Sequence, residues 1–213
     1  YLAMLRDAGL GSVPGTAAEI LDDEVREILS HKKVDTATWI EIVTTAHRVG
    51  LPTTSTVMYG HVETDAHVAA HLALLRRIQD ETGGFTEFVP LRFIHEKTAL
   101  YQRGLVQPTA SGASDLRMYA ASRLFFRGSI DHLQTSWVKL GHELAALTLA
   151  AGVDDFGGTL MEESISREAG ADAGEYTSPE EIERLIRSMG RVPRQRTTLY
   201  ASVGSEQIGR AHV

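Results

Sequence analysis

The sequence contains no cysteine, which excludes disulfide bonds, thiolate metal sites and cysteine nucleophiles within these residues. It also contains no apolar run near the roughly 18 residues expected of a membrane helix. Residues 1–7 lack the basic start and the long apolar stretch of a signal peptide. We therefore expect a protein of the cytoplasm that has no membrane partner.

Positive charge is scarce and dispersed along the chain. There are 21 Lys and Arg residues against 28 Asp and Glu residues, which gives a formal net charge of -7. Phosphate binding requires a concentrated positive face, so we expect no nucleic-acid partner. The 213 residues, of which 43% are apolar and 23% charged, predict one globular domain or part of a larger one.

Helical and extended segments alternate along the chain. Apolar residues recur about every 3.6 positions between glycine or capping signals, and they predict helices over residues 22–30, 38–49, 65–82, 115–127, 142–151 and 179–189. Runs of β-branched and apolar residues predict strands over 53–59, 85–92 and 130–139, with a weaker strand beginning at Ser12 and Val13. Strands that alternate with helices form a parallel sheet, so we expect an α/β fold.

Two α/β architectures fit this order, an open doubly wound sheet and part of a TIM-type (β/α)8 barrel. No glycine-rich phosphate loop follows any predicted strand, so a nucleotide-binding Rossmann fold lacks its main support. A complete barrel typically needs about 250 residues, so the βα units in this chain would form about half a barrel.

Polar side chains interrupt the predicted strands. Glu87 lies within an apolar strand, and Gln134 and Lys139 lie within the third strand. Burying a carboxylate is costly unless it is paired or faces a cavity. These groups could satisfy one another inside a barrel, but their matching positions on successive strands favour a substrate pocket, which in βα folds forms at the C-terminal strand ends.

Other catalytic and metal patterns are weak. His61 and Glu63 would point the same way in a strand, and His67 and His71 would share a helix face. No further ligand lies near either pair in the sequence, so structural or solvent-facing histidines are the better interpretation. No Ser-His-Asp order or nucleophile elbow supports hydrolysis.

Several strings together resemble one group of enzymes. They are GSVPGTAAEIL at 11–21, MYGHVET at 58–64 and QDETGGF at 79–85. They resemble the radical S-adenosylmethionine (SAM) enzymes that build deazaflavin and futalosine-pathway menaquinone precursors. GFTEFVPL at 84–91 and QTSWVK at 134–139 resemble the deazaflavin branch, and within it the tyrosine-using module of FO synthase, either fused to its partner module or as a separate subunit.

The resemblance covers about residues 2–200 and implies a fold. Residues 1–200 would form the C-terminal part of a radical SAM (β/α) barrel, with a C-terminal helix. Residues 201–213 would form a tail, and IGRAHV at 208–213 resembles a translated sequencing adapter rather than native protein. A half barrel leaves strand edges unpaired, so we expect this chain alone to be unstable or prone to aggregation.

The resemblance also implies a reaction and its cofactors. In this family, three cysteines at CxxxCxxC spacing hold a [4Fe–4S] cluster that reduces SAM, and the resulting radical abstracts hydrogen from tyrosine. A 4-hydroxybenzyl fragment then joins 5-amino-6-(D-ribitylamino)uracil, and a partner radical SAM module closes the deazaflavin ring. This chain has no cysteine and no metal ligand for the cluster. The cluster cysteines are expected upstream of Tyr1, and this chain alone is expected to be inactive.

The same resemblance implies that this half shapes the substrate and SAM pocket. The looser family motif GxIxGxxE is nearly met at positions 11, 13 and 15, with its acid one place late at position 19. The expected work of the pocket residues is positioning and shielding, without an assigned catalytic proton donor or acceptor. The pocket residues are Glu19, Tyr59, His61, Glu87, Thr135, Trp137 and Lys139.

Two other functions stay open. One is a sister radical SAM enzyme of futalosine-pathway menaquinone synthesis. The other is a cluster-free βα protein that binds a small molecule, which the absence of cysteine favours. The pocket interpretation requires that Glu87, Thr135 and Lys139 converge on one shared cavity.

Overall fold

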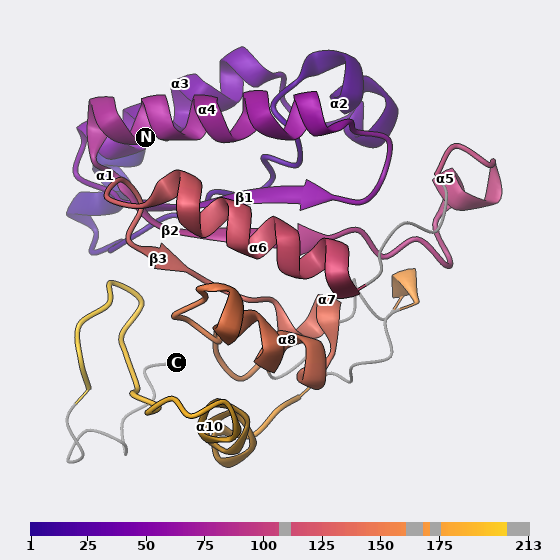
Figure 1. Cartoon of the computed structure of the whole chain (residues 1–213). Coiled ribbons are helices and arrows are strands. Elements are labelled where there is room, and N and C mark those ends of the chain that lie inside the picture. The colour runs from indigo at the N-terminus through magenta and orange to yellow at the C-terminus, as the bar shows by residue number, and fades with distance from the viewer. Residues whose placement is uncertain (107–111, 161–167, 171–175, 204–213) are drawn as a thin grey trace.

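The computed structural model describes residues 1–106, 112–160, 168–170 and 176–203, so the string at 208–213 lies outside the described residues. Helices and short strands alternate along the chain (Figure 1). The helices are α1 (Leu2–Asp7), α2 (Asp23–Ser30), α3 (Thr36–Arg48), α4 (Asp65–Thr82), α5 (Ala99–Gln102), α6 (Gly112–Phe126), α7 (Trp137–Leu140), α8 (His142–Thr148), the 3-10 turn η1 (Leu149–Ala151) and α10 (Pro179–Ser188). The strands are β1 (Thr53–Tyr59), β2 (Phe85–Arg92) and β3 (His132–Leu133).

The three strands form one parallel sheet in the order β1-β2-β3. Isolated parallel bridges continue the pairing beyond each edge, from Val13 to Thr53 and from Gln134 to Asp155. The order of these segments in space is therefore their order along the chain. The expected α/β class with a parallel sheet is confirmed, while the weak strand at Ser12 and Val13 amounts to a single bridge.

Local capping chemistry sets the helix starts. Thr64 accepts a hydrogen bond from the backbone N–H of His67 at the start of α4, and Ser178 accepts one from Glu181 at the start of α10. Asp35 caps α3 in the same way, so that helix begins two residues earlier than its apolar pattern predicts.

Among the helices of the described residues, none combines the length and the apolar character that a membrane-spanning helix requires.

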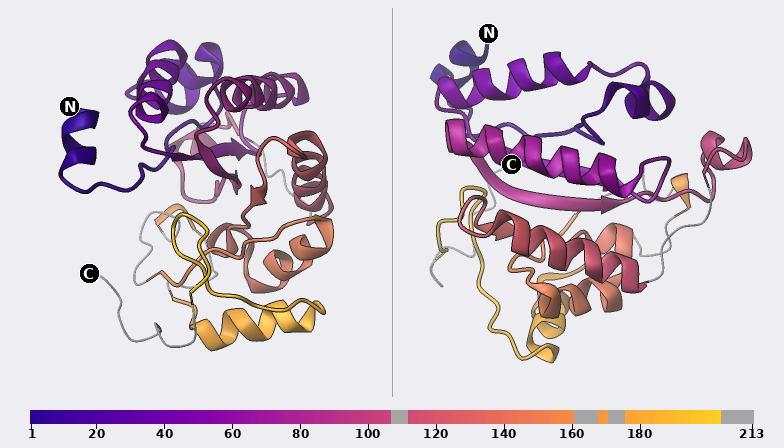
Figure 2. Two further views of the ribbon diagram at one scale, coloured as in Figure 1. Left: turned by 90° about the vertical axis from the view of Figure 1, so that its left-hand side faces the viewer. Right: turned by 45° about the horizontal axis from the view of Figure 1, so that its top comes forward.

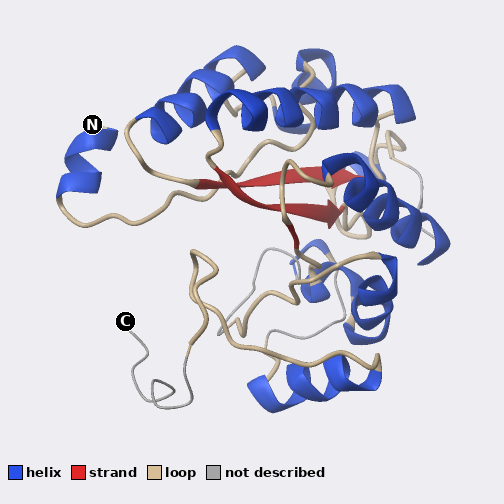
Figure 3. Cartoon of the chain, turned by 60° about the vertical axis from the view of Figure 1, so that its left-hand side comes forward, coloured by secondary structure: helices blue, strands red, loops and turns tan. Residues whose placement is uncertain are grey.

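The longer helices lie around one face of the sheet. In the left panel of Figure 2 they follow one another in an arc outside the strands, and the C-terminal segment lies on the opposite, inner side. Phe88 of β2 is 1% exposed, and its ring centroid lies 4.7 Å from that of Phe126 in α6. Because successive strand residues point to opposite faces, Glu87 points to the inner face. Figure 3 shows the same separation of helices and C-terminal segment.

The third predicted strand is wrong beyond Leu133. The strand β3 covers only His132 and Leu133, and the run that was expected to continue it turns into helix α7. A short apolar run does not distinguish a buried strand from a buried helix, and the buried side chains of Trp137 and Leu140 satisfy either pattern. Lys139 therefore lies on a short helix rather than on a strand.

Gly84 is required where α4 turns into β2. The His47 ring accepts or donates hydrogen bonds at 2.7 Å to Thr82 Oγ1 and at 3.0 Å to Thr53 Oγ1, and burial lowers the pKa of His47 to about 4. A Cβ atom on Gly84 would lie 2.1 Å from Cγ of this ring. The neutral imidazole and the glycine therefore fit together without room for a methyl group.

Replacing Gly84 with alanine is expected to lower the free energy of unfolding by about 1–3 kcal/mol, the usual cost of overpacking. Denaturant unfolding of the protein measures this change. Gly11→Ala is the matched control, because a Cβ atom there meets nothing within 4 Å. Equal unfolding midpoints for the two variants would show that His47 moves aside freely.

Candidate functional site

The C-terminal ends of β1 and β2 are tied to helix α6 by a buried carboxylate. Asp115 of α6 is 0% exposed. Its Oδ1 accepts a hydrogen bond from the Tyr59 hydroxyl at 2.7 Å, and its Oδ2 accepts one from Arg92 Nη1 at 3.3 Å. Burial raises the pKa of Tyr59, and the nearby Tyr119 and Asp115 raise it further. The phenol therefore stays protonated and acts as a hydrogen-bond donor.

The loop after β1 is held by Glu63. Its carboxylate accepts the backbone N–H groups of Gly60 at 2.5 Å and His61 at 2.8 Å, and His61 Nδ1 lies 3.0 Å from Glu63 Oε2. Burial by itself would raise the pKa of Glu63, but the hydrogen bonds from His61 and the backbone amides lower it to about 2. Glu63 is thus ionised at neutral pH, and its carboxylate holds the backbone of this loop through the N–H groups of Gly60 and His61.

Glu19 adjoins the same end of the sheet. Its carbonyl oxygen accepts a hydrogen bond from Met58 N at 2.9 Å. The residue is 6% exposed, and its carboxylate forms an ion pair with Lys33. Glu19 has a φ of 48°, which is uncommon for a residue other than glycine and marks backbone strain. The acidic side chain is therefore held at the C-terminal end of β1 by its own backbone bond.

Close packing against β1 accounts for the glycine at position 15, the second glycine of the GxIxGxxE-like segment. Its N–H donates to Thr54 Oγ1 at 2.8 Å, and a Cβ atom there would lie 1.8 Å from the Thr54 carbonyl oxygen. Only glycine allows this close approach of the loop to β1.

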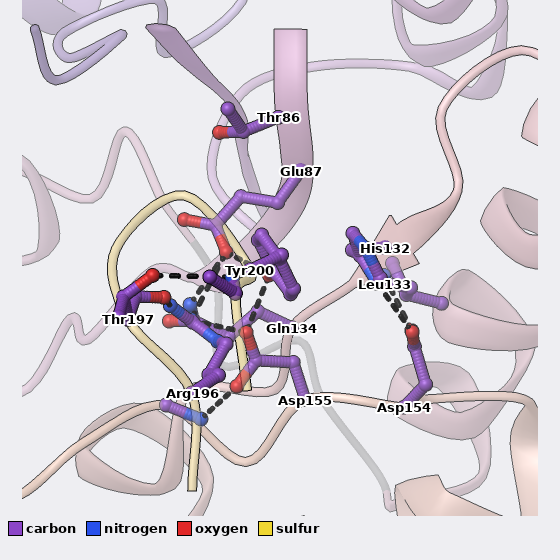
Figure 4. A network of polar contacts seen from close by, with 12 residues as sticks. Thr86, Glu87, His132, Leu133, Gln134, Asp154, Asp155, Arg196, Thr197 and Tyr200 are labelled. Atoms are coloured by element: carbon purple, nitrogen blue, oxygen red, sulfur yellow. Dashed lines mark hydrogen bonds and ion pairs between the residues drawn. The ribbon is translucent and has the colours of Figure 1, made fainter. Parts of the chain in front are cut away.

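A second polar cluster lies on the inner face, near the N-terminal end of β2 (Figure 4). Glu87 Oε2 accepts from Gln134 Nε2 at 3.0 Å and from Arg196 Nη2 at 3.4 Å, and it also contacts the Tyr200 hydroxyl. The Tyr200 hydroxyl lies 2.5 Å from Asp155 Oδ2, and Arg196 forms an ion pair with Asp155. The C-terminal segment therefore supplies both a cation and a phenol to two buried carboxyl groups.

Aromatic stacking completes this inner cluster. The rings of His132 and Tyr200 are stacked, with centroids 3.5 Å apart and planes 2° apart. The Arg196 guanidinium carbon lies 4.1 Å from the centroid of the Tyr200 ring. Tyr200 is thus held by its two faces as well as by its hydroxyl.

Comparison with known proteins places the chain in a family. Residues 82–207 match the family described as the CofH/MqnC C-terminal region. The chain belongs to this family. A relative from Methanothermobacter thermautotrophicus, the 5-amino-6-(D-ribitylamino)uracil--L-tyrosine 4-hydroxyphenyl transferase, is 55% identical over 202 residues, which are 95% of this chain and 55% of the relative. The protein of the same name from Methanocaldococcus jannaschii is 50% identical over 199 residues, which are 93% of this chain and 55% of that protein.

These relatives confirm the resemblance to the tyrosine-using group of FO synthase. The chain spans about half the length of the curated relatives it matches. The CofH/MqnC region accordingly supplies part of a longer enzyme in those proteins.

The residues predicted for the pocket of this CofH/MqnC chain fall into separate groups. Glu19, Tyr59 and His61 lie at the C-terminal end of β1, with the partners described above, whereas Glu87 belongs to the inner cluster. Thr135, Trp137 and Lys139 follow β3: Thr135 is 1% exposed, Trp137 Nε1 donates to the Gly158 carbonyl at 3.1 Å, and Lys139 is half-buried on α7.

An open cavity of about 390 Å³ lies elsewhere, where the start of the chain meets the C-terminal segment, and none of the seven predicted residues lines it. Its lining residues are Leu10, Gly11, Ser12, Thr197, Thr198 and Leu199. The convergence of Glu87, Thr135 and Lys139 on one cavity stays a prediction.

Four functional-site residues were missed from the sequence: Asp115, Asp155, Arg196 and Tyr200. The apolar pattern predicts a helix that begins at Asp115, whereas α6 begins at Gly112 and Asp115 is buried inside its first turn. Arg196 and Tyr200 follow the last helix in a stretch without periodic apolar residues, so no local pattern signals them. The buried charge of Glu87 was the one available signal that a cation or acid partner must exist.

Proposed function

We propose that this chain is the C-terminal half of a cytoplasmic radical SAM transferase. The enzyme joins a tyrosine-derived 4-hydroxybenzyl group to 5-amino-6-(D-ribitylamino)uracil in deazaflavin (coenzyme F-420) synthesis, and a partner radical SAM module or subunit closes the ring. The observation that carries this proposal is the family match, together with relatives of 50% and 55% identity that bear the name of that transferase.

The arrangement of the sheet supports a partial TIM-type barrel over residues 1–200. The strands are parallel and consecutive, bridges extend both edges, and the longer helices lie on one face. In a barrel, strand order follows chain order and helices surround the outside. A doubly wound sheet instead has helices on both faces and a point where the strand order reverses. The tail expected over residues 201–213 lies mostly outside the described residues.

The C-terminal ends of the strands are the proposed position of the pocket, as in other βα enzymes. Tyr59 fixes the end of β1 against Asp115, and the loop with His61 follows directly. Glu19 lies beside Met58, and Trp137, Thr135 and Lys139 follow β3. These residues would position the substrates and exclude water, which matters because a radical intermediate reacts with whatever lies near it.

The residues of this chain do not fit the iron–sulfur cluster. The sequence contains no cysteine, and the described residues contain no group of three or more His, Asp or Glu side chains able to hold a metal ion. In this proposal the thiolate ligands therefore belong to the other half of the enzyme, while this half contributes positioning residues.

The activity of the full-length protein tests the proposal. Supplied anaerobically with reductant, SAM, tyrosine and 5-amino-6-(D-ribitylamino)uracil, the full-length protein is expected to form the 4-hydroxybenzyl adduct, detected by mass spectrometry. The 213-residue chain alone is expected to form none, because it cannot ligate the cluster. Omitting the uracil is the control. Ligand binding by an iron-free full-length protein that never cleaves SAM would support the cluster-free alternative.

A second function deserves a parallel assay because the family description joins CofH with MqnC. Futalosine-pathway menaquinone synthesis is that second candidate. Turnover of a futalosine-derived substrate, without any adduct from tyrosine, would move the assignment to it.

A further inference from the structure

The C-terminal hairpin (residues 195–203) lies against the inner face of the sheet. Arg196 and Ser202 form an antiparallel bridge, and Thr197 N donates to Ala201 O at 2.8 Å. Tyr200 stands at the turn with a φ of 62°, a conformation that costs energy for a bulky side chain. Strong contacts of the Tyr200 side chain must therefore offset this strain.

The contacts of the Tyr200 hydroxyl require more than one proton. The hydroxyl makes short contacts with Glu87 Oε2 and with Asp155 Oδ2. A phenol carries a single O–H and can donate to only one carboxylate. The other contact is a hydrogen bond only if that carboxyl group carries a proton and donates it to the phenol oxygen.

The charges of Glu87, Asp155 and Arg196 also indicate that one of the two carboxyl groups is protonated. Glu87 and Asp155 are each 7% exposed, and among the residues that the structure describes Arg196 is the cation paired with both of them. Two ionised carboxylates beside one guanidinium would leave a buried negative charge without compensation, which is costly.

Glu87 is the better site for this proton. Asp155 forms the direct ion pair with Arg196, whereas Glu87 Oε2 lies 3.4 Å from the guanidinium. Burial raises the pKa of Glu87, and the charge of Asp155 raises it further. Together they outweigh the hydrogen bonds from Tyr200 and Gln134 and the charge of Arg196, which lower it. On the far side of Tyr200 lies His132, which is itself paired with Asp154 at 2.7 Å.

We propose that Glu87, Tyr200 and Asp155 share one additional proton, held by Glu87 at neutral pH, and that this proton fastens the C-terminal hairpin over the inner face of the sheet. Glu87 thereby helps to hold the hairpin at the N-terminal end of the strands, whereas Asp115 lies at their C-terminal end. This inference is independent of the reaction that the enzyme catalyses.

The stability that protonated Glu87 gives to the docked hairpin is expected to fall as the pH rises. A carboxyl group whose pKa is higher in the folded state stabilises that state while it is protonated. The contribution of Glu87 is therefore complete below the pKa that it has in the unfolded chain, and it is lost as the pH rises through its raised folded pKa.

Two matched variants of the full-length protein test this. Glu87→Gln supplies a neutral group of similar size, so hydrogen exchange of the amides of residues 195–203, corrected for intrinsic rates, is expected to stay near that of the unsubstituted protein and to lose its pH dependence. Asp155→Asn removes the ion-pair partner of Arg196, and exchange in the hairpin is expected to rise about tenfold or more. Equal acceleration in both variants would overturn the proposal.

Infrared spectroscopy of the unsubstituted protein locates the proton, so the proposal can be tested even if both variants fail to fold. At neutral pH, carbon-13 labelling of glutamate carboxyl groups is expected to shift a carbonyl stretch of a protonated acid, and aspartate labelling is expected to leave it in place. Absence of such a band, or a shift on aspartate labelling instead, would show that Glu87 does not hold the proton. Tyr200→Phe, which keeps the ring and removes only the hydroxyl, is expected to accelerate hairpin exchange as well.

Discussion

Replacing Asp115 with alanine is expected to lower the free energy of unfolding by about 2–3 kcal/mol, because the buried Tyr59 hydroxyl loses its acceptor and the partly exposed Arg92 loses its anion. Asp115 is 0% exposed and accepts hydrogen bonds from both Tyr59 and Arg92. The variant would leave a buried phenol donor unpaired, while Arg92, whose side chain is 27% exposed, could turn to solvent. Denaturant unfolding of the full-length protein measures the loss.

A matched surface variant separates this effect from the general loss of a carboxylate. Glu183→Ala removes an exposed partner of Arg187 in α10, and such pairs contribute only about 0.3–0.5 kcal/mol. A double-mutant cycle with Tyr59→Phe should show coupling to Asp115→Ala, since the two side chains bond directly. A cost for Asp115→Ala as small as that for Glu183→Ala would contradict the buried network.

Phe88→Ala is the second substitution with a large expected effect. Phe88 is 1% exposed, and its ring packs against Phe126 between β2 and α6. Truncating a buried phenylalanine to alanine removes apolar contacts and leaves a cavity, at a cost of about 3–5 kcal/mol. The expected result is a lower unfolding midpoint with little change in the denaturant slope.

The control for Phe88 comes from the same helix layer. Leu124 of α6 is 74% exposed, so Leu124→Ala is expected to change stability by no more than about 0.5 kcal/mol. If Phe88→Ala were equally mild, α6 would not cover β2 in the way described, and the inner position of the neighbouring Glu87 would also be in question.

Helix and strand types were predictable where a local cause dominates. The apolar period of α4 and the capping residues Thr64 and Ser178 lie within a few positions of the structure that they specify. The strand β3 was predicted too long because a short apolar run fits a buried strand and a buried helix equally well, and only the packing of Trp137 and Leu140 decides between them.

The candidate site was predicted less completely than the fold. Glu87 could be singled out, because a carboxylate in an apolar strand demands a partner. Its partners could not be named, because Arg196 and Tyr200 follow it by 109 and 113 positions in the chain. Asp115 likewise stands 56 positions from Tyr59, and nothing in its local sequence distinguishes it from an exposed helix-start carboxylate.

The sequence alone determined the alternation of strands and helices, the helix caps and the inability of this chain to bind iron through sulfur, since periodicity, capping and the presence of a thiol are properties of neighbouring or single residues. The tertiary structure alone decided which face of β2 carries Glu87 toward the C-terminal hairpin, and which helix supplies the carboxylate for Tyr59. Those contacts join residues far apart in the chain, and only the folding of the sheet with its helices brings them within hydrogen-bonding distance.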